Sequence, residues 1–248
     1  MKELIFLCSL ALPGTVAAQD LIPPGTILPV QLSQSLSSDK SRPGQVITGR
    51  VAQNVPLPGG KKIRARTKVV GHIIRVAPAT GGRGVAVSLR FDTLIVSKSS
   101  IPITVSLRAL ASVMELEDAE IPPMGPDRGI SAASYTTTQV GGDVVYQGGG
   151  PVMNGGEVVG QPVPDGVLVR VREKPGTKCR AAVDGSESPQ ALWLFSSDAC
   201  GIYGYSHLTI THAGRTSPVG EIVLASDGRR WTVRDGSGLL LRVIGNRR

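Results

Sequence analysis

Apolar and polar residues alternate along several short segments of this chain. Val85, Val87, Leu89 and Phe91 share one face of such a segment, and Ile101–Leu107 repeats the pattern. A period of two is typical of a β-strand with one buried face, and no convincing helical period accompanies it. Turn formers are abundant, with 31 glycines and 18 prolines. The sequence therefore predicts an all-β fold made of small β-sandwich or barrel-like domains.

The spacing of turns and strands predicts two domains. Alternating segments fill residues 19–112 and resume over 166–248. Between them, 113–165 is rich in glycine and proline, which favours a linker over an ordered loop packed on a sheet. Asp227-Gly228 lies between two alternating segments and is a strong hairpin signal. We therefore expect the C-terminal domain to be a meander of neighbouring strands.

The N-terminus has the three parts of a secretory signal peptide. Lys2 precedes the apolar run Leu4–Leu12, and the small residues Val16-Ala17-Ala18 follow it. The run is far shorter than the ~20 residues of a membrane-spanning helix. We expect cleavage of residues 1–18 and export to the periplasm or the medium, with no integral membrane segment left after cleavage.

Two cysteines, Cys179 and Cys200, remain after the expected cleavage. In an oxidising compartment an even pair is most simply a disulfide. The alternative is a nucleophilic Cys200 served by His207 or His212. We favour the disulfide, since a free thiol beside a second cysteine would not stay reduced there.

The chain is basic, with a formal net charge of +8. Lys62, Arg64, Arg66 and Lys68 alternate with apolar residues over 62–76, so a single strand would place them in one row. Such a row could follow an anionic polymer. The alternative, which we favour, is a solvated face or an edge strand charged against aggregation, because no stacking aromatic residue is close in sequence.

No motif of a known catalytic or metal-binding type is present. His207 and His212 are five residues apart and would face opposite sides of a strand. We therefore assign no catalytic residue, no metal ligand and no cofactor. An enzyme stays open as an alternative, namely a hydrolase of envelope polymers whose acids, or Ser206 and His212, meet only in the fold.

Several short motifs occur in a characteristic order within residues 21–108. They are Pro24-Gly25-Thr26, Ser37-Ser38-Asp39 with Pro43-Gly44, Ile63–Gly71, Val87–Ile95 and Ile101-Pro102-Ile103. This order resembles the periplasmic β-barrel domain of the TrbI-like scaffold proteins of conjugation and type IV secretion. The chain departs from the family pattern at Arg64-Ala65-Arg66, and the part from Gly166 onward shows no such resemblance.

The resemblance implies a barrel-like module of the cell envelope that pairs with other envelope proteins. The main expectation is therefore an exported, non-enzymatic scaffold or binding module. The two alternatives are the envelope-polymer hydrolase and a binder of anionic polymer that uses the basic row.

Overall fold

The computed structural model describes residues 22–119, 136–146, 150–173, 179 and 183–244. The predicted signal peptide, residues 1–18, lies outside them. The described chain is built mainly of strands, with one α-helix, α1 (Val113–Ala119), and a short 3-10 turn at Pro58–Gly60. The all-β prediction is confirmed. No helix within the described residues has the length and apolar character needed to cross a bilayer.

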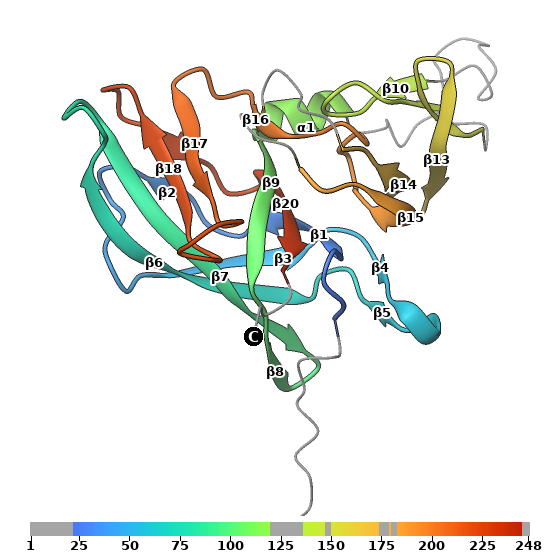
Figure 1. Ribbon diagram of the computed structural model, residues 1–248, viewed down its shortest axis with the longest axis horizontal. Coiled ribbons are helices and arrows are strands. Elements are labelled where there is room, and N and C mark those ends of the chain that lie inside the picture. The colour runs from blue at the N-terminus through green and yellow to red at the C-terminus, as the bar shows by residue number, and fades with distance from the viewer. Residues whose placement is uncertain (1–21, 120–135, 147–149, 174–178, 180–182, 245–248) are drawn as a thin grey trace, which may run out of the picture.

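A ten-stranded sheet forms the larger part of the molecule (Figure 1). Its main path runs β16-β9-β20-β1-β3-β6-β7-β18-β17, and β8 pairs with β7. Its strands are β1 (Ile27–Leu32), β3 (Val46–Val51), β6 (Lys68–Pro78), β7 (Val85–Val96), β8 (Ser99–Pro102), β9 (Val105–Ala111), β16 (Gly201–Tyr203), β17 (Leu208–Ala213), β18 (Ile222–Ser226) and β20 (Gly238–Val243). The end strands β16 and β17 contact each other, so the sheet curls into a barrel-like shape.

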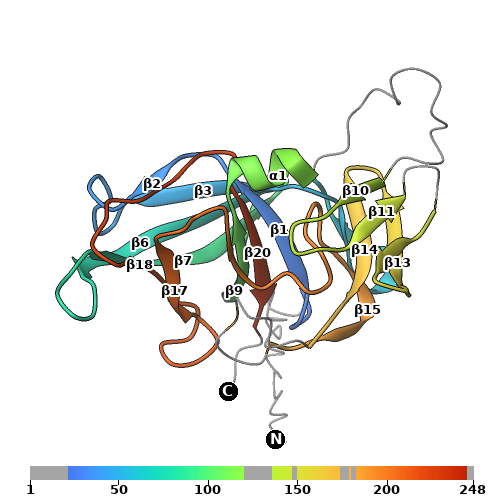
Figure 2. The ribbon, with the colours of Figure 1, turned by 90° about the horizontal axis from the view of Figure 1, so that it is seen from above.

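A second, six-stranded antiparallel sheet follows the order of its strands in the chain. It contains β10 (Thr136–Thr138), β11 (Val144–Tyr146), β12 (Val152–Asn154), β13 (Glu157–Val163), β14 (Gly166–Val171) and β15 (Ser186–Ala191). Figure 2 shows this sheet beside the barrel-like sheet, on the side of β1.

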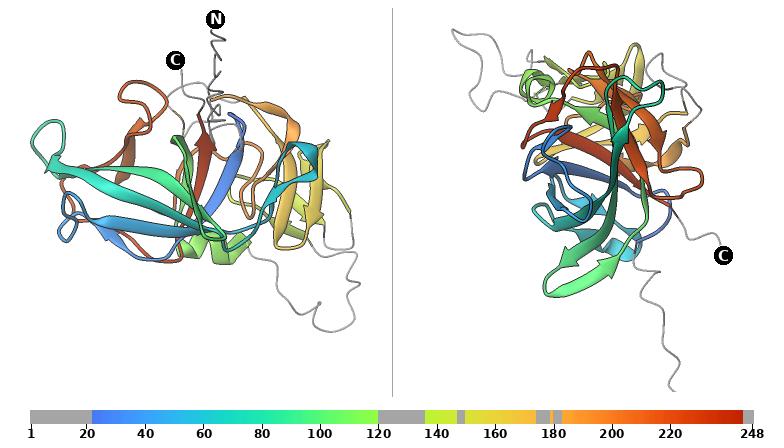
Figure 3. Two further views of the ribbon diagram at one scale, coloured as in Figure 1. Left: turned by 90° about the horizontal axis from the view of Figure 1, so that it is seen from below. Right: turned by 90° about the vertical axis from the view of Figure 1, so that its left-hand side faces the viewer.

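Two short pairs complete the fold. β2 (Leu36–Ser37) pairs with β19 (Thr232–Val233), and β4 (Val55–Pro56) pairs with β5 (Lys62–Ile63). The β4–β5 hairpin extends from the barrel-like sheet to the second sheet, where β4 contacts β15 (Figure 3, left).

The two sheets are joined by strands whose two faces are both buried. All seven residues of β9 are buried. Leu107 faces the core of the barrel-like sheet, whereas Ala109 and Ala111 pack in a second core with Val167 and Phe195 of the other part. Strand β20 divides its side chains between the two cores in the same way. The two parts therefore share a wall of strands.

The sheets do not follow the predicted domain boundaries. Strands β16, β17, β18 and β20 come from 166–248 but lie in one sheet with the strands of 19–112, while β14 and β15 belong to the second sheet. The predicted C-terminal meander is wrong, because β18 pairs with β7, β19 with β2, and β20 with β1 and β9. An Asp-Gly signal marks a turn but does not determine which strands pair after it.

The predicted linker is also wrong for the part of 113–165 that the structure describes. This part forms α1 and the strands β10–β13. Its valines supply the missing signal: Val145, Val152 and Val159 are buried in the core between the sheets. The glycine-rich composition is typical of a linker, but in this segment the glycines lie largely in turns between short strands with buried valines.

Candidate ligand-binding cleft

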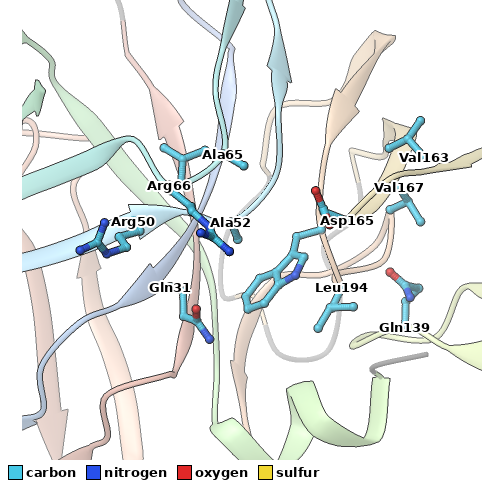
Figure 4. Close-up of a pocket in the computed structure, with 13 residues that line it drawn as sticks. Gln31, Arg50, Ala52, Ala65, Arg66, Gln139, Val163, Asp165, Val167 and Leu194 are labelled. Carbon is cyan, nitrogen blue, oxygen red and sulfur yellow. The ribbon is translucent and has the colours of Figure 1, made fainter. Parts of the chain in front are cut away.

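A cleft of about 820 Å³ opens where the two sheets meet (Figure 4). One wall comes from β1, β3 and the turn before β6, and the other from the β13–β14 turn and the loop after β15. The polar and aromatic residues that line it are Gln31, Arg50, Arg66, Gln139, Asp165 and Trp193. In Figure 4, Arg50, Arg66 and Gln31 lie on the first wall, and Asp165, Val163 and Val167 lie on the second.

Strained backbone conformations are concentrated at the cleft. Four non-glycine residues of the described chain have a left-handed backbone: Arg66 (φ 67°), Ser97 (φ 58°), Asp165 (φ 67°) and Trp193 (φ 54°). Three of these four line the cleft. A left-handed conformation is uncommon outside glycine and is an outlier for a bulky residue. Each such residue costs about 1–3 kcal/mol, and strain of this kind clusters at functional sites.

Two buried glutamines hold Trp193 in this conformation. Gln53 Oε1 accepts a hydrogen bond from Trp193 N at 2.7 Å, and Gln53 Nε2 donates to Val167 O at 2.9 Å. Gln139, with its amide nitrogen turned toward the loop, donates to Trp193 O at 3.1 Å. The backbone of Trp193 is thus fixed from both sides by side chains that are distant in sequence.

Gly166 allows the β13–β14 turn to lie directly against the Trp193 backbone and Gln53. A Cβ at this position would lie 2.8 Å from Trp193 Cα and would also collide with Gln53 Oε1. Any larger residue at this position would therefore push the Trp193 loop away from β14. The loop, the turn and Gln53 form one rigid support for the indole.

The charged groups of the cleft are free to meet a ligand. Arg50, Arg66 and Asp165 are exposed, and no ion pair within the described ranges involves any of them. Guanidinium groups bind carboxylates, sulfates and phosphates through paired hydrogen bonds. A cleft with two such groups, one aromatic residue and one opposing carboxylate is suited to an anionic ligand that also carries hydrogen-bond donors.

The predicted basic row is broken by a turn. Lys62 belongs to β5, Arg64–Thr67 form a turn closed by Thr67 Oγ1 donating to Arg64 O at 2.6 Å, and Lys68 begins β6. The prediction of one strand over 62–76 is therefore wrong. All four cations are exposed, but Arg66 alone among them lines the cleft.

The structure brings the two cysteines together. The Cα atoms of Cys179 and Cys200 are 5.6 Å apart, within the range of a disulfide. His212 Nδ1 lies 2.6 Å from Glu221 O, and His207 Nδ1 lies 3.9 Å from Asp227 Oδ2. Across the described contacts, neither histidine is hydrogen-bonded to Ser206 or Cys200, and no group of three potential metal ligands forms there.

Two buried charged groups lie outside the cleft. Arg108 is 4% exposed and donates to Ala199 O at 2.9 Å and to Arg172 O at 2.8 Å. Burial lowers the pKa of Arg108 to about 10, so the guanidinium stays protonated at neutral pH. Asp143 is fully buried, and burial raises its pKa. Both groups connect the loop after Phe195 to its neighbours and have a structural role.

Sequence reasoning identified Arg66 but missed Trp193, Asp165 and Arg50. Asp165-Gly166 is a turn signal of the same kind as Asp227-Gly228, and it could have placed Asp165 at the end of a hairpin. Nothing in the sequence shows that this hairpin meets β3, which lies more than a hundred residues earlier.

Comparisons of the chain with protein-family models, with curated proteins and with solved structures gave no match. These comparisons do not bear on the TrbI-like resemblance of residues 21–108.

Proposed function

We propose that this chain is an exported cell-envelope binding module that holds an anionic ligand in the cleft between its two sheets. The observation that carries the proposal is the meeting of Arg66, Asp165 and Trp193, all left-handed, at one cleft. Hydrogen bonds from Gln53 and Gln139 hold the backbone of Trp193 in its left-handed conformation. Export is supported by the leader-like N-terminus and by the cysteine pair at disulfide distance.

The charge of the cleft favours an anion. Arg50 and Arg66 outnumber Asp165, and three further exposed cations, Lys62, Arg64 and Lys68, lie within four residues of Arg66 in sequence. A basic surrounding raises the local concentration of an anionic polymer, while the cleft itself selects it.

Binding of heparin, a sulfated polyanion, to the mature chain tests this proposal. We expect the double variant Arg50→Ala/Arg66→Ala to bind at least about tenfold more weakly, as the loss of two charge-assisted contacts implies. The matched control is Lys62→Ala/Arg64→Ala, which removes the same charge from exposed positions outside the cleft. An equal loss in both variants would show that only diffuse charge matters and would refute the proposal.

A scaffold role like that of the TrbI-like proteins is a second candidate. The observation in its favour is that β17 (Leu208–Ala213), although it contacts the short strand β16, forms a strand pairing only with β18 within the described chain. Such an edge can accept a strand from another protein. Stable co-purification with defined envelope proteins, lost when proline replaces Thr209 in β17, would support it.

A further inference from the structure

We infer that the anionic ligand is an acidic polysaccharide in which a charged sugar alternates with a neutral one. A pyranose ring stacks on Trp193, its carboxylate binds Arg66, and hydroxyl groups of the next sugar donate to Asp165. The inference rests on the proposed function, because it names the ligand class of the same cleft.

Trp193 provides the first step of the argument. The indole belongs to a loop whose backbone is fixed by Gln53 and Gln139 and by the absence of a side chain at Gly166. A rigid, partly exposed aromatic ring loses little entropy when a ligand covers it. Its flat apolar face fits the flat face of C–H groups on a pyranose ring, and its polar N–H can still be hydrated.

The opposite signs of charge on the two walls provide the second step. Arg66 and Arg50 lie on one wall and Asp165 on the other (Figure 4). A carboxylate accepts hydrogen bonds from hydroxyl groups but repels a second anion. The ligand should therefore present a negative charge to one wall and uncharged donors to the other.

The same contrast argues against a nucleic acid or a polyphosphate. In these polymers every unit carries a charge, so one phosphate would face Asp165. Grooves for single-stranded nucleic acids also stack successive bases on several aromatic residues. Trp193 is the one aromatic residue among those that line this cleft. The volume, about 820 Å³, is within the range of small-ligand sites and suits a short oligosaccharide.

Calorimetric titration with hyaluronan hexasaccharide, which alternates an acidic and a neutral sugar, tests the inference. The neutral chitin hexasaccharide is the matched ligand. We expect the mature protein to bind hyaluronan hexasaccharide at least about tenfold more tightly than it binds chitin hexasaccharide, since the hyaluronan carboxylate contacts Arg66. Trp193→Ala should weaken this binding at least about tenfold, whereas Trp193→Phe should retain most of it because a ring remains.

Trp231→Phe is the control variant, since Trp231 is buried in the other core. Hyaluronan affinity that is unchanged in a folded Trp193→Ala chain would overturn the inference. Tighter binding of polyphosphate or single-stranded DNA than of hyaluronan would overturn it as well. If binding of these polyanions or of heparin still depends on Arg50 and Arg66, the proposed function stands, and only the assignment of a polysaccharide with alternating charged and neutral sugars fails. If no anionic probe depends on those arginines, the proposed function itself fails.

Discussion

Arg66 combines a strained backbone with an exposed charge. Its left-handed backbone, with φ of 67°, is one that glycine adopts without strain. Its guanidinium is exposed and makes no ion pair within the described chain. The strain is therefore not offset by local contacts of the side chain, which is consistent with a role toward a ligand.

Two substitutions at this position separate strain from charge. Arg66→Gly should be about 1 kcal/mol more stable than Arg66→Ala, because glycine relieves the left-handed strain and alanine retains it. Both variants should lose binding of anionic ligands equally, since both lack the guanidinium. Urea unfolding of the two variants gives the difference in stability. Equal stability of the two would show that this turn is not strained.

The buried carboxyl group of Asp143 should make the stability of the fold depend on pH. It accepts hydrogen bonds from Ser197 N at 2.6 Å and from Asn154 Nδ2 at 2.7 Å. Burial nevertheless raises its pKa above the ordinary 3.8. Between 3.8 and the raised pKa, the folded state keeps a proton that the unfolded chain has released. The contribution of Asp143 to the free energy of unfolding therefore falls as pH rises through this window.

Comparison with Asp143→Asn isolates this contribution from that of the other carboxyl groups. Urea unfolding at several pH values from about 3 to 7 should show the native chain losing stability relative to the variant as the pH rises. A constant difference between the two chains across this range would contradict the assignment of a raised pKa.

At the scale of elements, the alternation of apolar residues located most strands of the ten-stranded sheet. The pattern also predicts strands over 26–32 and 239–244, and β1, β7 and β20 lie where it places them. Alternation also predicts a strand over 191–195, but β15 ends at Ala191 and a turn follows at Trp193-Leu194, where Gln53 and Gln139 hold Trp193 in a left-handed conformation. Those contacts join segments far apart in the chain, so no local pattern could reveal them.

Gly49 illustrates a second limit of local patterns. A glycine inside a strand pattern predicts a bulge, yet the pairing of β3 with β1 and β6 runs through Gly49 without a register shift. A Cβ here would lie 2.5 Å from Val30 Cγ1. The glycine is needed for close approach to β1, which depends on a neighbouring strand that the sequence does not identify.

The loop that ends at Cys200 is a further element with a testable prediction. Non-reducing mass spectrometry of the exported chain should show Cys179 linked to Cys200, whose Cα atoms are 5.6 Å apart. A bridge across their sequence separation of 21 should stabilise the fold by about 3 kcal/mol in the chain-entropy model. Cys179→Ser/Cys200→Ser should be less stable by a similar amount. Free thiols in protein recovered from the periplasm would contradict this prediction.

At the scale of the whole molecule, the shared strands predict a single cooperative unit. Residues of β9 and β20 belong to both cores, so neither sheet can lose its packing without exposing apolar surface of the other. The chain has two tryptophans, and each reports on one core: Trp231 on the barrel-like sheet and Trp193 on the second sheet.

Single-tryptophan variants test this cooperativity. In both Trp193→Phe and Trp231→Phe, the unfolding midpoint from fluorescence should coincide with the midpoint from circular dichroism, because both sheets unfold together. Separate midpoints in either variant would show that the two sheets unfold independently and would contradict the shared-core account.

The cleft depends on this arrangement, since its two walls belong to different sheets. Its direct test is the fluorescence of Trp193 in the Trp231→Phe chain during titration with hyaluronan hexasaccharide. We predict a saturable change in emission that Arg66→Ala shifts to a higher ligand concentration in the same background. Unchanged emission at ligand concentrations where calorimetry shows binding would place the ligand elsewhere and contradict the account.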